Sequence, residues 1–125
     1  MNQYGAGLLG VMLFASGCVY YNSIYNAEQS YGEAEAFRRA GHDSLARQAY
    51  QDVVRGTARG YRRDPDGEWG DDALFLLGRA HLRLGEIRAA RVALEQAAER
   101  SESAEMNLAV LVYLALANVK SGDLQ

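Results

Sequence analysis

The chain has 125 residues, a length typical of one domain. Its 13 basic and 16 acidic residues give a formal net charge of -3, which argues against nucleic-acid binding because such proteins normally present a basic surface. Proline occurs once, residues that favour helices are abundant, and no long segment alternates apolar and polar residues as strands do. These features predict an all-α fold.

The N-terminal segment has the features of a secretion signal. Residues 8–15 form an apolar run that is too short to cross a bilayer but fits the apolar centre of a signal peptide. The small residues Ser16 and Gly17 then lead directly into Cys18, the only cysteine of the chain. Because a lone cysteine cannot form an intramolecular disulfide, its position after the apolar run is the informative feature.

This arrangement resembles the bacterial lipobox, in which the cysteine receives a lipid and the peptide is cut before it. The resemblance implies a signal segment at residues 1–17, a lipidated Cys18 and a short tether over residues 18–23. It also implies an anchor on the periplasmic side of the outer membrane, because Val19 and not an aspartate follows the cysteine. The pattern departs from the usual one at Ala15, where leucine is common, and the alternative is a free or buried cysteine.

Residues 71–104 predict two helices that fold back on each other as a hairpin. Asp71 and Asp72 suit a helix N-terminus, and Gly85 suits the left-handed residue that ends a helix. One apolar stripe of helical period precedes Gly85 and another follows it at once. So short a connection places the two helices side by side.

The hairpin resembles the tetratricopeptide repeat (TPR), a helix–turn–helix unit of 34 residues. The match includes small residues at Gly78 and Ala90, where the two helices cross and larger side chains would clash. The turn at Gly85 recurs at Gly41 and Gly122. The expected units are therefore residues about 24–62, about 71–104 and, incomplete, about 105–125. The resemblance implies about five helices, stacked as antiparallel hairpins in a short right-handed solenoid.

Part of the chain resembles a TPR variant of cell-envelope proteins. Residues 46–50 have the spacing of its second helix, and Pro65 leads into the segment Asp71-Asp72-Ala73-Leu74. The lipoprotein of outer-membrane β-barrel assembly and the periplasmic coordinator of cell division share this style. The resemblance identifies a repeat subtype and implies an envelope protein.

The last expected helix, at about residues 105–120, is apolar on all sides, with no polar residue between Leu108 and Ala117. A helix of this kind is normally covered on both sides, whereas solenoids end in a helix with a polar outer face. We therefore expect either that the chain is a piece of a longer protein, which we favour, or that a second subunit covers this surface.

In TPR proteins the first helices of successive units line a concave groove that holds a peptide. Carried over to this chain, the resemblance implies groove residues on all three units: Tyr31, Glu35, Arg38 and Arg39; Phe75, Arg79, Leu82 and Arg83; Val112, Leu116 and Lys120. The cationic side chains would pair with carboxylates of a partner, and the others would give apolar contacts. The alternative is that the arginines form a solvated helix face with ordinary i,i+4 ion pairs.

These features predict a protein-binding scaffold without catalytic activity, metal or cofactor. His42 lies at a turn, His81 occupies a packing position, and no phosphate-binding glycine pattern is present. Trp69 either anchors an interface or packs over the hairpin below it. Two alternatives to a membrane-anchored envelope scaffold stay open: a docking module of a longer lipoprotein with an enzyme in its C-terminal part, and a structural element of a larger envelope assembly.

Overall fold

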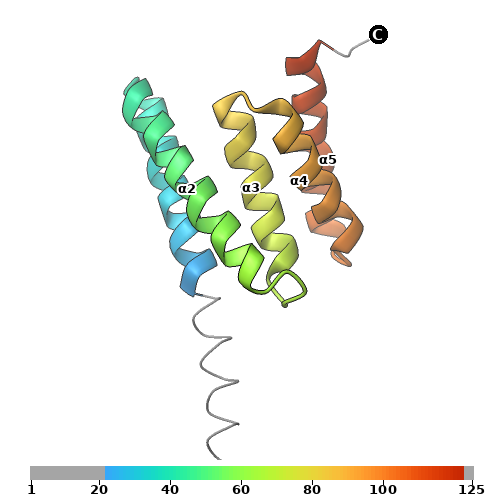
Figure 1. Cartoon of the computed structure of the whole chain (residues 1–125). Coiled ribbons are helices and arrows are strands. Elements are labelled where there is room, and N and C mark those ends of the chain that lie inside the picture. Colours follow the sequence, from blue (N-terminus) through green and yellow to red (C-terminus); the bar gives the residue numbers. More distant parts are fainter. Residues whose placement is uncertain (1–21, 123–125) are drawn as a thin grey trace, which may run out of the picture.

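The structure, a computed structural model, describes residues 22–122, and these residues form helices joined by turns (Figure 1). Residues 22–39 are helical, and four helices follow: α2 (Asp43–Arg63), α3 (Gly70–Leu84), α4 (Ile87–Arg100) and α5 (Ala104–Ser121). The prediction of an all-α fold is confirmed for this part of the chain. The helix already includes residues 22 and 23, which the sequence analysis placed in a tether.

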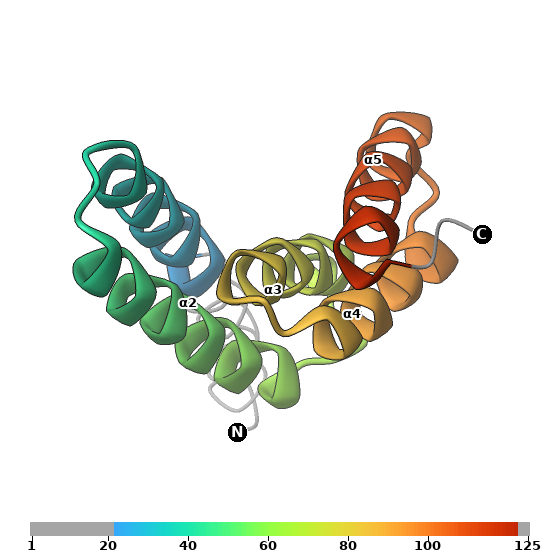
Figure 2. The same cartoon turned by 90° about the horizontal axis from the view of Figure 1, so that it is seen from above.

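The helices form two antiparallel hairpins and a fifth helix that packs on the second hairpin. Helix α3 contacts both α2 and α4, and α5 contacts α4 and, less extensively, α3. Seen from above, the helical residues 22–39, α3 and α5 lie on the inner side of a curved row, and α2 and α4 lie on the outer side (Figure 2). The curvature gives the described part of the molecule a concave face.

Glycine ends three of the helices with the same backbone geometry. Gly41, Gly85 and Gly122 all have φ of 77°, a left-handed conformation in which a side chain would be strained. At the second turn the Gly85 N–H donates to the Leu82 carbonyl at 3.1 Å, and the Glu86 N–H donates to the His81 carbonyl at 3.0 Å. This pair of bonds satisfies carbonyls that the end of the helix would otherwise leave free. The predicted turns are therefore confirmed.

The crossing of α3 and α4 depends on the absence of a side chain at Gly78. A Cβ atom built there would lie 2.5 Å from Leu94 Cγ and 3.4 Å from the Ala90 carbonyl oxygen. Leu94 and Ala90 are fully buried. The two helices therefore approach as closely as the predicted pair of small residues allows.

The connection between α2 and α3 closes the lower end of the first hairpin. Trp69 lies just before α3 and, together with Tyr61, packs against Ile24 and Ala73. This contact fits the packing role that the sequence analysis weighed for the tryptophan. It also links the beginning of the described chain to α3.

Helix α5 begins at a serine cap and leaves one face uncovered. The Ser103 hydroxyl accepts a hydrogen bond from the Met106 N–H at 3.3 Å and so caps the helix. Val110 and Ala117 are buried against the second hairpin. Five large apolar side chains of α5 are exposed: Leu108, Leu111, Val112, Leu116 and Val119.

Candidate binding groove on the concave face

A shallow hollow lies between the inner helices α3 and α5, and its lining is partly apolar and partly polar. Its volume is about 240 Å³, and it is lined by Phe75, Ser103, Glu105, Met106 and Ala109. The Phe75 ring meets the Tyr113 ring edge to face, with the ring centroids 5.5 Å apart. Phe75 is the one lining residue from α3, and the others come from α5 and the residue that caps it. The hollow has the size and lining to accept one apolar side chain of a partner, with a carboxylate at its edge.

Arg79 lies beside this hollow, held between two aromatic rings. Its guanidinium carbon is 4.6 Å from the centroid of the Tyr31 ring and 4.7 Å from the centroid of the Phe75 ring. Its Nη2 atom donates to Glu28 Oε1 at 2.5 Å. Only 15% of the Arg79 side chain is exposed, compared with 44% of the Glu28 side chain. Arg79 therefore fixes the helical residues 22–39 against α3 by stacking and by an ion pair.

Glu35 of the first described helix accepts hydrogen bonds from side chains of three elements, including Arg83, which lies one turn beyond Arg79 on α3. The Tyr50 hydroxyl of α2 donates to it at 2.5 Å, Arg83 Nε of α3 donates at 2.6 Å, and Arg38 Nη2 donates at 3.0 Å. The Glu35 side chain is 13% exposed. Burial by itself would raise the pKa of Glu35, but the hydrogen bonds from Tyr50, Arg83 and Arg38 outweigh it and hold the pKa at about 2.

Three of the four predicted groove arginines, Arg38, Arg79 and Arg83, are therefore paired within the chain. The sequence analysis offered two arrangements for them, partner contacts or i,i+4 pairs along one helix, and Arg79 and Arg83 instead pair between helices. Glu28, which the sequence analysis did not select, is the partner of Arg79. Glu28 and Glu35 lie two turns apart on one helix, whereas Arg79 and Arg83 lie one turn apart on another, so the spacing along the sequence did not reveal these pairs.

Carboxylates without a cationic partner in the described part of the chain lie close together at the start of α3. The pKa of Asp72 is raised by burial and then by the neighbouring charges of Asp71 and Glu28. Arg79 pairs with Glu28, and no hydrogen bond or ion pair joins Asp72 to a cationic side chain among the described residues. A cationic group of a partner at this end of the concave face would relieve the repulsion between the carboxylates.

Two predicted groove residues are buried, and those assignments are wrong. Leu82 is 2% exposed because it packs with Ala90 and Ala117 between α4 and α5. Tyr31 is 6% exposed because its ring lies in the core of the first hairpin and under Arg79. Both side chains support the concave face from below and offer no surface to a partner.

The other predicted groove residues lie on three different helices. Phe75, Arg79 and Arg83 lie on the concave side of α3, and Arg38 joins Arg83 at Glu35. Arg39 is exposed at the end of the first described helix. Val112, Leu116 and Lys120 are exposed on α5, where the first two belong to its uncovered apolar face. Cys18 and the proposed signal segment lie outside the described residues.

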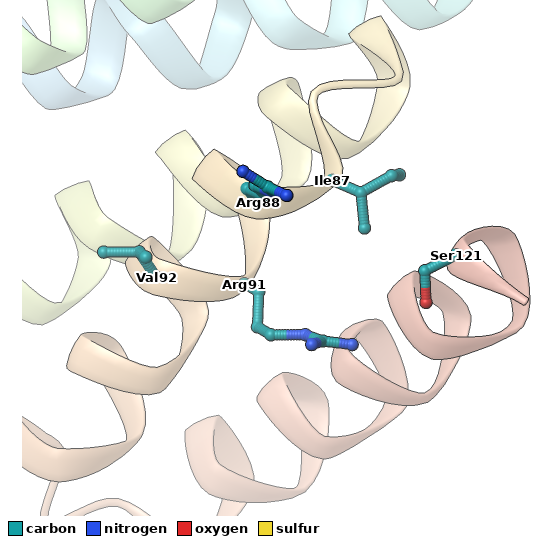
Figure 3. A pocket seen from close by; sticks show the side chains of 5 residues that line it. All are labelled: Ile87, Arg88, Arg91, Val92 and Ser121. Carbon is teal, nitrogen blue, oxygen red and sulfur yellow. The ribbon is translucent and has the colours of Figure 1, made fainter. Parts of the chain in front are cut away.

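A second hollow lies on the other side of α5. Its volume is about 690 Å³, and it is lined by Ile87, Arg88, Arg91, Val92 and Ser121 (Figure 3). Figure 3 shows Arg91 reaching from α4 toward α5, where its Nη2 atom donates to Asn118 Oδ1 at 2.6 Å. This hollow is larger than the one at Phe75, and its lining combines the apolar Ile87 and Val92 with two arginines.

Among residues 22–122, no group of three or more His, Cys, Asp or Glu side chains is placed to hold a metal ion. His81 instead bonds Glu86, with Nδ1 and Oε2 2.7 Å apart. No helix in the same range is long and apolar enough to span a membrane.

Comparison with known proteins identifies the central hairpin. Residues 72–102 match the family model described as tetratricopeptide repeat. They comprise nearly all of α3, the Gly85 turn and α4, the hairpin that crosses at Gly78. Searches of curated proteins and of solved structures gave no match. TPR units form stacked helical solenoids that serve as protein–protein interaction modules. Residues 72–102 therefore form a TPR hairpin, and the curved row of helices on either side of it is consistent with a TPR-like helical solenoid.

Proposed function

We propose that the chain is a membrane-tethered scaffold of the bacterial cell envelope that holds a segment of a partner protein on its concave face. The observation that carries the proposal is the shallow hollow between the inner helices α3 and α5, where Phe75, Met106 and Ala109 give an apolar floor and Glu105 a carboxylate. Phe75, which lines the hollow, stacks against Arg79, and Arg79 pairs with Glu28, so these contacts support the position of the Phe75 ring. A preformed site avoids the entropic cost of ordering side chains on binding.

The open charges define the partner segment further. Arg79, the arginine beside the hollow, is neutralised by Glu28, whereas Arg38 and Arg83 share the one carboxylate of Glu35 one turn further along. Close to the hollow, Glu105 and, at the start of α3, Asp72 supply carboxylates. The expected ligand is therefore a segment with an apolar side chain for the hollow and a Lys or Arg close to it.

A photocrosslinking residue tests the groove directly. We would place it at Ala109, which lines the hollow, and as a matched control at Ala89, an exposed alanine of the outer helix α4. A partner crosslinked from Ala109, not from Ala89, and lost when Phe75→Ala is added, supports the proposal. Equal crosslinking from both positions, or no effect of Phe75→Ala, contradicts it.

The membrane tether rests on the sequence, where the lone Cys18 follows the apolar run of residues 8–15 and two small residues. We propose that lipids on Cys18 anchor the protein at the periplasmic side of the outer membrane, since several acyl chains together give stable anchoring. Labelled palmitate in a Gram-negative host tests this, with Cys18→Ser as control. If the wild type is labelled and Cys18→Ser is not, the result supports the lipid anchor. If the wild type is not labelled, the result refutes it.

A further inference from the structure

The uncovered face of α5 is the largest group of exposed apolar side chains in the described part of the molecule. Leu108 is 65% exposed, Leu111 61% and Val112 54%. Leu116 and Val119 extend the same face toward the C-terminal end of the helix. Apolar patches of this kind on soluble proteins mark surfaces that bind another protein or a membrane.

The face is separate from the packing of α5 within the chain. Val110 and Ala117, on the opposite side of the helix, are fully buried against the second hairpin. The exposed residues recur every three or four positions, so they form one stripe along the whole helix. The stripe is thus long enough to pack against another helix over its full length.

We propose that this face pairs with the same face of a second copy of the chain, with the two α5 helices antiparallel. The argument for a second copy is the distribution of charge. Glu105 in the first turn and Lys120 in the last turn are the only charged residues of α5, and both are exposed. An otherwise uncharged face with opposite charges at its two ends is complementary to itself when one copy is reversed.

The helical period supports this register. Glu105 and Lys120 lie on the same side of the apolar stripe, and the middle of the segment between them falls at Val112 and Tyr113. A two-fold axis at this point places Glu105 of each copy beside Lys120 of the other. The two Val112 side chains meet next to the axis, and Leu108 and Leu116 lie on either side of it. A parallel pair would instead place like charges together.

The oligomeric state of the full chain tests the pairing. The Cys18→Ser variant is used throughout, so that no disulfide or lipid on Cys18 links two copies. Sedimentation equilibrium should give a mass approaching twice 13.7 kDa as the concentration rises into the micromolar range. Val112→Arg, which places two charges at the axis, should give a monomer with an unchanged helical circular dichroism spectrum. Leu45→Arg, at a residue 48% exposed on α2, is the control and should stay dimeric.

Charge exchange tests the antiparallel register. Glu105→Lys or Lys120→Glu alone should raise the dissociation constant of the dimer by about tenfold, because each creates two like-charge contacts across the interface. The combined variant Glu105→Lys/Lys120→Glu should return to the affinity of the parent. A parent that is still monomeric at about 100 μM overturns the proposal, because a dimer with a micromolar dissociation constant would be mostly associated at that concentration. Single variants that dimerise as the parent does, or a combined variant that does not recover, overturn it as well.

Discussion

Replacing Glu35 by glutamine tests the ion-pair cluster that joins the first described helix to α2 and α3. The carboxylate accepts hydrogen bonds from Tyr50, Arg83 and Arg38. Glutamine keeps the shape of the side chain but removes the charge that attracts the two guanidinium groups. The substitution therefore measures what the negative charge contributes to folding, with little change in packing.

The magnitude follows from the pKa of Glu35. A shift from 4.5 in the unfolded chain to about 2 in the folded protein corresponds to about 3 kcal/mol in favour of the folded state at neutral pH. The carboxylate lies at the edge of solvent, which screens part of this interaction. We expect Glu35→Gln to lower the free energy of unfolding by about 2 kcal/mol at pH 7.

The same linkage fixes the pH dependence. Because folding depresses the pKa, the contribution of Glu35 is fully present above pH 4.5 and is lost as the pH falls toward 2. The difference between wild type and Glu35→Gln should therefore shrink steadily over that interval. Urea unfolding followed by circular dichroism at pH 7 and at successively lower pH measures it.

Glu33→Gln is the matched control, since Glu33 is exposed on the same helix. It should change the free energy of unfolding by no more than about 0.5 kcal/mol at pH 7. The reasoning fails if Glu35→Gln behaves like this control at pH 7. It also fails if the loss in Glu35→Gln is the same at pH 7 and near pH 2.

Three glycine substitutions test the backbone argument, each by thermal and urea unfolding. Gly78→Ala should cost about 1–3 kcal/mol, because the new Cβ atom would meet Leu94 Cγ at 2.5 Å; an unchanged midpoint would show that the helix crossing does not need glycine. Gly56→Ala, in α2 with no atom near the new Cβ, should instead stabilise by about 0.5–1 kcal/mol, and a loss there would contradict the open space at that position. Gly85→Ala should cost about 1–2 kcal/mol because φ is 77°; full stability would mean that the turn adopts another conformation.

The parts of the fold that could be predicted depend on neighbours in the sequence. Gly85 marks a helix end through its own backbone, and Gly78 marks a crossing that the adjacent hairpin must make. The apolar α5 could likewise be predicted as incompletely covered, because its composition exceeds what one neighbouring helix can bury. Such features are determined within one hairpin and need no knowledge of how hairpins stack.

The parts that could not be predicted depend on the angle between hairpins. Whether Arg79 faces a partner or Glu28 is decided by how closely the first described helix approaches α3. Leu82 lies on α3 near the predicted groove surface, but α5 packs over it and covers it with Ala117. The helical period of a sequence predicts which residues share one face of a helix. Which of these faces is exposed to solvent depends on how the helices stack.

The contact between Ile24 and Trp69 has a mechanical consequence. A pull on the chain before residue 22 enters the fold through the turn that holds Ile24, and from there it passes through Trp69 and Ala73 into α3, the central helix. Tension from a tether would therefore reach α3, the helix that carries Phe75, and also the end of α2 through Tyr61. Since Trp69 is the only tryptophan of the chain, its fluorescence would report this strain without a label.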